Sequence, residues 1–207
     1  MKPADGFACK NFPCTDVNHD GYSIPSRDVD PATVRVLLIS EAAPSDPADY
    51  YTAAGSPAYA QTTLTAFADA GYNFSILQEL IDKGVYFTTA VKCAKTSYGI
   101  QTATVNTCAA LLAQELALFP NLKAILLMGD VAIKGLNAVA KQAKEPRVIP
   151  AGSTYKLRGQ VYSFHGARVF PSYLQVGPSF NIEKSKRRMI AEDIGKAMKV
   201  AGIEKSH

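Results

Sequence analysis

The sequence predicts an α/β fold, a three-layer α/β/α sandwich around a mostly parallel central sheet. Short apolar runs alternate with longer amphipathic segments between residues 34 and 142, which is the first observation behind this prediction. Glycine or proline stands where most of these segments should end, which is the second. The third is composition: 47% of the 207 residues are hydrophobic and 19% are charged, which favours a globular chain over a disordered one. We expect residues 1–207 to form a single domain.

The first strand is expected at Val34–Ile39, an apolar run that follows an irregular, polar arm at residues 1–31. A run with almost no polar residues is typical of a strand that is buried on both faces, as in parallel sheets. The loop at residues 40–57 contains three prolines and many small residues. It follows the end of a buried strand, where α/β folds bind their ligands.

Two helices and a second strand come next. The segments Ala60–Ala70 and Phe74–Lys83 have helical patterns, and Gly71 and Gly84 are suitable residues to end them. Val85–Val91 is rich in β-branched and aromatic residues, which favour a strand.

The segment Thr104–Phe119 is amphipathic at helical spacing, and Pro120 ends it because proline cannot continue a helix. Leu122–Met128 is a third apolar run, and a further helix begins at Gly129 and extends to about Gln142. This β-α-β-α-β-α succession implies parallel strands with helices on both faces of the sheet.

The pattern changes after Pro150 to shorter elements. We expect short strands at Tyr155–Leu157, Val161–Phe164 and Arg168–Phe170, followed by a last helix at Asn181–Ala201.

Charge is distributed unevenly along the chain, which has 22 Lys and Arg and 18 Asp and Glu, for a net charge of +4. From residue 134 onward there are 14 basic and 5 acidic residues, a net charge of +9, whereas the first 133 residues have a net charge of −5. A basic third of the chain is typical of a surface that binds a polyanion, although a solvated helix face has the same composition. Four residues near the start of the last helix are candidate phosphate contacts: Lys184, Lys186, Arg187 and Arg188.

The four cysteines are Cys9, Cys14, Cys93 and Cys108. The sequence has no apolar run of 18 residues and no apolar leader at its start, so we expect a cytoplasmic monomer with no membrane span. Disulfides are disfavoured in the reducing cytoplasm, where metal ligation is the usual reason for paired cysteines. Cys93 follows the second strand and Cys108 begins the next helix, so both reach one edge of the sheet, where the arm can add Cys9 and Cys14. Four thiolates suit a structural zinc ion or a four-iron cluster; the alternative is four free, buried cysteines.

The order of these motifs resembles that of the family-4 uracil-DNA glycosylases. The residues that carry the resemblance are VYFTTAVKC at 85–93, Cys108 fifteen residues later, and a strand ending in LLMGDVA at 126–132. The family has a similar strand ending in VVKC, a second cysteine at a similar distance and an N-terminal cysteine pair, which is usually closer together than the pair here. The resemblance implies an α/β/α fold, a four-iron four-sulfur cluster on the four cysteines, DNA as partner, single- or double-stranded, and excision of a damaged or deaminated base.

The resemblance also implies candidate catalytic residues. The family has a GEAPG motif after its first strand, and residues 40–44 of this chain read SEAAP, so Glu41 matches the acidic residue that positions water. Asp46 is a second candidate on the same loop. An isolated carboxylate on a loop is more often a capping residue, which is the alternative for both.

Base recognition should differ from that of the family. An aromatic residue near Tyr51 stacks the base in the family, but the two tyrosines at 50 and 51 can equally anchor their loop to the core. Thr89 stands where the family has Asn, and its single hydroxyl cannot read a pyrimidine edge in two places. The family histidine of the HPS motif is replaced, with Leu174 in its place in one alignment, and Gln175 is a candidate substitute donor.

Three hypotheses for function follow. The protein is a base-excision glycosylase with a non-standard base pocket, or a nucleic-acid-binding relative that keeps the fold and the cluster but has lost catalysis. A small-molecule enzyme that uses the loop at 40–57 is the third, which lacks support from a nucleophile elbow or a GxGxxG motif.

Overall fold

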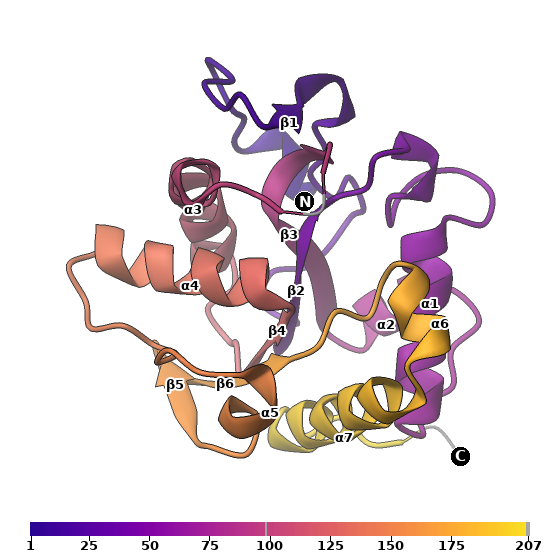
Figure 1. The fold of residues 1–207 in the computed structure, drawn as a ribbon. Coiled ribbons are helices and arrows are strands. Elements are labelled where there is room, and N and C mark those ends of the chain that lie inside the picture. Colours follow the sequence, from indigo (N-terminus) through magenta and orange to yellow (C-terminus); the bar gives the residue numbers. More distant parts are fainter. Residues whose placement is uncertain (98, 206–207) are drawn as a thin grey trace.

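The computed structural model describes residues 1–97 and 99–205, and within them six strands form one sheet in the order β1-β3-β2-β4-β6-β5 (Figure 1). Neighbouring strands β3, β2, β4 and β6 are parallel, whereas β1 and β5 are antiparallel to their neighbours at the two edges. The strands are β1 Val17–Asn18, β2 Val36–Ala43, β3 Val85–Lys95, β4 Ala124–Met128, β5 Tyr162–Phe164 and β6 Ala167–Ser172.

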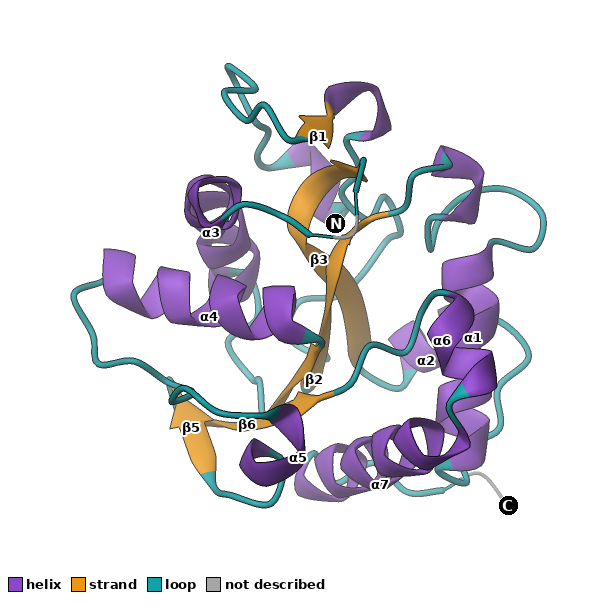
Figure 2. Cartoon of the chain, viewed as in Figure 1, coloured by secondary structure: helices purple, strands orange, loops and turns teal. Residues whose placement is uncertain are grey.

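Helices cover both faces of this sheet, with α3 and α4 on one side and α1 and α7 on the other (Figures 1 and 2). The arrangement confirms the expected α/β/α sandwich. The helices are α1 Ala58–Asp69, α2 Leu77–Asp82, α3 Thr102–Ala117, α4 Asp130–Gln142, α5 Thr154–Leu157, α6 Pro178–Ile182 and α7 Lys184–Val200, with short 3-10 turns η1 Pro3–Asp5, η2 His19–Gly21 and η3 Pro47–Asp49. Among the described residues, no helix has both the length and the apolar character needed to cross a bilayer.

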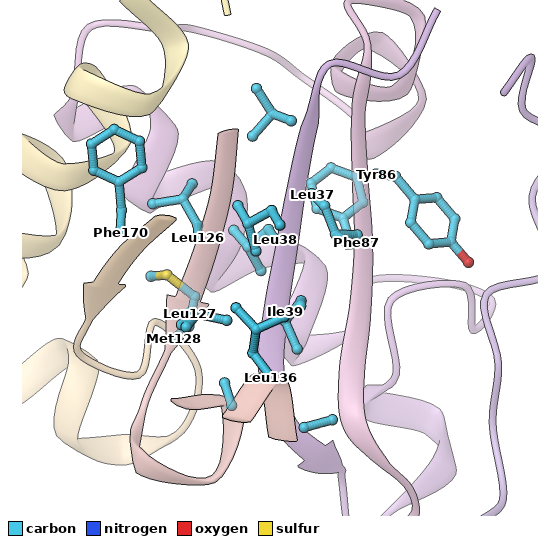
Figure 3. Packing of buried hydrophobic residues seen from close by; sticks show 14 of the residues in the cluster. Leu37, Leu38, Ile39, Tyr86, Phe87, Leu126, Leu127, Met128, Leu136 and Phe170 are labelled. Carbon is cyan, nitrogen blue, oxygen red and sulfur yellow. The ribbon is translucent and has the colours of Figure 1, made fainter. Parts of the chain in front are cut away.

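The core lies between the central strands and their helices (Figure 3). Leu37, Leu38 and Ile39 on β2 are consecutive and all fully buried, so both faces of this strand are covered. Leu126 and Leu127 on β4 are buried in the same way. The runs of consecutive apolar residues therefore form interior strands of a parallel sheet, as predicted.

The order of the strands defines where a ligand should bind. The chain passes from β2 to β3 on one side of β2, and then crosses to β4 on the other side. At such a switch point the connections leave the carboxyl ends of two neighbouring strands in opposite directions, which opens a crevice between them. The crevice here lies beyond the ends of β2 and β4.

The N-terminal arm is tied to the body of the protein by backbone pairing. Val17 and Asn18 pair with the end of β3, and the Ser23 N–H donates a hydrogen bond of 2.8 Å to the Lys92 carbonyl. The Asp16 carboxylate accepts a hydrogen bond of 2.7 Å from the backbone N–H of Gln101, just before α3. These contacts hold the arm against the end of β3 and the start of α3.

The prediction of a strand at Tyr155–Leu157 was wrong, because these residues form the helical turn α5. Within this turn Leu157 is buried, while the side chain of Tyr155 is 70% exposed. A strand would need a neighbour to pair with, and the edge of the sheet beside β6 is occupied by β5. The helical turn buries the leucine without such a partner.

The expected last helix at Asn181–Ala201 is two helices. The backbone leaves the helical region at Glu183, where ψ is 78°, so α6 ends before it and α7 begins after it. The break separates α6, which borders the crevice, from the long helix α7 that packs on the sheet.

Candidate functional site

A cleft of about 490 Å³ opens at the switch point. Its walls come from the ends of β2 and β3, the start of α4, the segment after β6, and α6 with the first turns of α7. Charged and aromatic residues on these walls include Glu41, Lys95, Lys134, Tyr173, Phe180 and Lys186. The volume lies within the range of about 300–1,000 Å³ that is typical of small-molecule sites.

Glu41 lies in this cleft, at the rigid carboxyl end of β2 rather than on the loop where it was expected. Its Oε1 accepts a hydrogen bond of 3.3 Å from the Val131 N–H in the first turn of α4, and its Oε2 lies 3.7 Å from Lys95 Nζ. Gly129 has a φ of 99°, and a Cβ there would lie 2.5 Å from Glu41 Oε1. The glycine is thus required both by the backbone turn and by the approach of the carboxylate.

The described wall of the cleft has charges of both signs. Its ionisable residues are Lys95, Lys134, Lys186, Glu41, Asp130 and Glu183. Lys186 Nζ lies 2.6 Å from a carboxylate oxygen of Glu183 and 5.6 Å from the centre of the Tyr173 ring. The cleft combines a carboxylate, cations and aromatic rings, which is what a site for a charged aromatic ligand requires.

The four basic residues expected to contact DNA are in the first turns of α7, namely Lys184, Lys186, Arg187 and Arg188. Lys186 lines the cleft, and Lys184 is exposed beside it. Arg187 makes two hydrogen bonds to the Asp69 carboxylate on α1, and Arg188 Nε lies 3.8 Å from Glu192. Both arginines are thus paired with carboxylates of the protein, and a phosphate would compete with these carboxylates.

Asp46, the second catalytic candidate, is not part of the described wall of the cleft. Its carboxylate accepts a hydrogen bond of 2.9 Å from the Ala48 N–H and caps the turn η3. The structure therefore gives Asp46 the capping role that was the alternative for it.

Tyr51 and Gln175 are brought together, but inside the protein. Gln175 Nε2 donates to Ser40 Oγ and to the Tyr51 hydroxyl at 2.9 Å each, and it lies 3.3 Å from Thr63 Oγ1. The Tyr51 ring stacks on Phe87 with 5.7 Å between ring centres. Burial raises the pKa of Tyr51 to about 12, although its hydrogen bonds oppose the shift. Tyr51 thus anchors its loop to the core.

Thr89 is also fully buried, on β3 beside Ser40. Its hydroxyl interacts with the hydroxyl of the neighbouring Tyr50. Burial raises the pKa of Tyr50 well above its usual range, and the charge of Glu115 raises it further, whereas the interaction with Thr89 lowers it. We refer to Ser40, Tyr50, Tyr51, Thr63, Thr89 and Gln175 as the tyrosine cluster. In this conformation none of its members lines the cleft.

Sequence analysis missed a buried ion pair between β3 and α3. Lys92 and Glu115 are both fully buried and in direct contact. Lys92 Nζ also donates to Thr88 Oγ1 at 2.7 Å and to the Thr89 carbonyl at 2.6 Å, and the Tyr86 hydroxyl donates to Glu115 at 3.1 Å. A signal was present, since Glu115 falls on the apolar stripe of its helix. Such a polar residue on a buried face needs a partner.

A second missed network supports the wall of the cleft. Asp193 on α7 is buried and accepts hydrogen bonds of 3.0 and 2.9 Å from the guanidinium of Arg158, and one of 2.7 Å from Ser172 Oγ. Burial raises the pKa of Asp193, and the bonds from Arg158 and Ser172 oppose this shift. Ser172 also accepts a hydrogen bond of 3.1 Å at its carbonyl from the Gly129 N–H. The network therefore fixes the segment that carries Tyr173 against both α4 and α7.

The four cysteines share one region at the end of β3. Cys93 and Cys108 are buried, while Cys9 and Cys14 are partly exposed. Burial, followed by the charges of the thiolates at 108, 9 and 14, raises the pKa of Cys93 to about 12. The arm thus brings its two thiols within electrostatic reach of Cys93.

The donor set fits an iron–sulfur cluster in its chemistry. Among the described residues, no three His, Cys, Asp or Glu side chains are grouped closely enough to hold a metal ion. Thiolates that share one zinc ion at about 2.3 Å lie within about 4.6 Å of one another. A four-iron cluster binds each thiolate to a different iron, so its thiolates stand farther apart. Four soft thiol donors in one region are the ligands such a cluster uses.

No protein-family model and no curated protein matches this chain. The function proposed below therefore depends on the chemistry of the cleft, the cysteines and the motifs in the sequence.

Proposed function

We propose that the protein binds DNA and excises a damaged or deaminated base, as a base-excision glycosylase with a non-standard base pocket. The observation that carries the proposal is the placement of Glu41, the residue that matches the acidic position of the glycosylase motif. It lies on the wall of a 490 Å³ cleft at the switch point of the sheet, held by Val131 and close to Lys95.

The cleft offers the features that a flipped nucleotide needs. Base-excising enzymes rotate the target nucleotide out of the stack and enclose its base between apolar and aromatic side chains. Tyr173 and Phe180 line this cleft, and Lys134 and Lys186 add positive charge for phosphate groups. The base would therefore stack on Tyr173 instead of on Tyr51, a further difference from the family besides Thr89 and the missing motif histidine.

Hydrolysis of the glycosidic bond gives each group a role. The bond between C1′ and the base nitrogen breaks with its electron pair on the base, and the sugar becomes cation-like. Glu41 would orient a water molecule whose oxygen bonds to C1′, and its carboxylate offsets the positive charge of the sugar. One proton of the water leaves through Glu41 and neutralises the base anion. Lys134, on the same wall as Glu41, is the candidate donor to that anion.

We further propose that Cys9, Cys14, Cys93 and Cys108 hold a four-iron four-sulfur cluster, with zinc as the alternative occupant. When bound, such a cluster supplies a rigid thiolate cross-link between the arm and the sheet. The four thiols are the ligands, and the contacts of Val17 and Ser23 with β3 keep the two halves of the set together.

Base release tests the proposal directly. The substrates are single- and double-stranded DNA with one uracil or one hypoxanthine, and the readout is the number of abasic sites formed. We expect Glu41→Gln to lower the rate by about 100-fold or more, since the amide cannot accept a proton. Asp82→Asn, which changes an exposed carboxylate on α2, is the matched control and should leave the rate unchanged. Failure to release any base, or equal rates for Glu41→Gln and wild type, would refute catalysis.

A second candidate function is supported by a specific observation. The tyrosine cluster is closed, and Glu41 already has partners in Val131 and Lys95, so the protein can be a DNA-binding relative that no longer excises bases. This alternative expects DNA binding that weakens steeply with salt, without abasic sites. Abasic sites above the level of Glu41→Gln would exclude it.

A further inference from the structure

His19 lies against the cysteine region and was not among the residues predicted for it. Its Nδ1 is 3.5 Å from Cys93 Sγ, within hydrogen-bond distance for sulfur. The turn η2 that carries His19 follows β1 directly, and Asn18 caps this turn through a 3.0 Å hydrogen bond from the Asp20 N–H. Because β1 pairs with the end of β3, the backbone fixes the distance between the imidazole and the thiol.

An aromatic contact holds the imidazole in place. The Phe12 ring packs on His19 with 5.1 Å between ring centres, and edge-on against Tyr22 at 5.2 Å. Phe12 has a φ of 41°, a left-handed conformation that costs free energy in a non-glycine residue and persists only when its surroundings impose it. It lies between Cys9 and Cys14, so the strained turn and the ring contact position this pair of thiols together with His19.

We propose that His19 is a positioning residue for the metal-binding cysteines, donating a hydrogen bond from Nδ1–H to the Cys93 thiolate when the thiols bind their metal. The inference rests on the cofactor in the proposed function, and it assigns to the arm a role beyond supplying ligands. Tyr22, whose hydroxyl accepts a 3.1 Å hydrogen bond from the Cys9 N–H, and Phe12 complete the protein shell on this side.

The chemical consequence of this hydrogen bond is specific. A donor to a cluster thiolate withdraws negative charge from the sulfur, which favours the reduced form of the cluster because that form carries one more electron. Removing the donor should therefore make the midpoint potential more negative. A residue that only fills space would leave the potential where it was.

Two substitutions separate the hydrogen bond from the packing. His19→Asn places an amide nitrogen where Nδ1 lies and so keeps the donor, whereas His19→Phe keeps a ring for Phe12 to pack on but has no donor. His165→Asn is the matched control, because His165 is exposed and pairs with Glu145, away from the cysteines. All variants are purified without oxygen, and iron, sulfide and zinc are measured together with the circular dichroism spectrum.

The midpoint potential of the bound cluster is the deciding readout, with its rate of loss in air as a second. We expect His19→Phe to favour the oxidised form by about threefold to tenfold, up to about 59 mV for a one-electron couple, and to lose iron faster. His19→Asn and His165→Asn should match the wild type. If zinc is the occupant, the same order should appear in its affinity, with about a tenfold loss in His19→Phe.

The outcomes are distinguishable from failure of the proposed function. A folded wild type that binds neither iron nor zinc after reconstitution would overturn both the cofactor and the role of His19. A wild type that binds its metal, with the same potential or affinity in His19→Phe, would overturn the role of His19 alone. Absence of base release would refute catalysis, and the metal and potential measurements would still decide the cofactor and the role of His19.

Discussion

Two neighbouring regions at the carboxyl edge of the sheet contain the residues that the sequence suggested for base recognition and catalysis, and they differ in accessibility. The cleft is open and holds Glu41, whereas the tyrosine cluster is closed and holds Tyr51, Thr89 and Gln175. In the cleft, lysine and carboxylate side chains line an open cavity. In the cluster, polar groups face one another, and the two N–H groups of Gln175 are used on the hydroxyls of Ser40 and Tyr51. A sequence motif therefore locates a residue along a strand. It does not determine whether the side chains on the adjoining loop point into the cleft or into the core.

The largest expected effect concerns the buried ion pair that adjoins the tyrosine cluster, where Lys92 donates to the Thr89 carbonyl. Lys92→Met leaves Glu115 buried without its partner, and we expect a loss of about 3–5 kcal/mol in the free energy of unfolding. Urea unfolding followed by circular dichroism measures it. The double variant Lys92→Met, Glu115→Leu should recover most of the loss, because no charge is then left alone. If Glu41→Gln destabilises the protein as much as Lys92→Met, the distinction between an open, functional region and a closed, structural one fails.

The next effect is a dependence on pH. The pKa of Tyr51 is raised to about 12 in the folded protein by burial, against about 10 when unfolded. The native state therefore holds this proton more tightly, so its contribution to stability is complete below about pH 10 and is lost as the pH rises towards 12. The two-unit shift corresponds to about 2–3 kcal/mol. Urea midpoints measured between pH 9 and 12 should show a Tyr51-dependent fall that begins above about pH 10, and Tyr51→Phe should reduce this fall. An unchanged fall would mean that Tyr51 is accessible to solvent, and that the cluster opens.

The smallest effect is on binding in the cleft. Tyr173→Ala should weaken DNA binding by about 1–3 kcal/mol, the contribution of one base stacked on an aromatic ring. Fluorescence anisotropy with a short oligonucleotide at fixed salt measures this affinity. Tyr155→Ala is the control, because Tyr155 is 70% exposed and does not belong to the described wall of the cleft. Equal affinities for the two variants would place the base elsewhere, with the tyrosine cluster as the next region to test.

Much of the fold could be predicted because its signals are local. The runs at 34–39, 85–91 and 122–128 are apolar over consecutive residues, and only a doubly covered strand uses such a run. Glu41 was expected on the loop after the first strand, but the strand continues through it to Ala43, because the small residues after Ile39 still pair with β3. Tyr155–Leu157 failed because three residues with strand propensity do not form a strand without a neighbour.

The rest of the site depends on contacts between residues far apart in the sequence. Whether Tyr51 points into the cleft or into the core is decided by Gln175, which lies 124 residues away. The pairs of Lys92 with Glu115 and of Arg158 with Asp193 are likewise distant, and nothing local to either partner specifies the other. His19 was missed for the same reason, because the pairing of β1 with β3 places it beside Cys93.

The pairing of the arm with β3 also bears on what a bound metal would contribute. In a zinc finger the metal supplies the free energy of folding. In this protein Val17, Asn18 and Ser23 add backbone hydrogen bonds to the sheet that no metal supplies. Chelation of a bound metal would remove only one of the two contributions, so loss of metal and release of the arm are separable events.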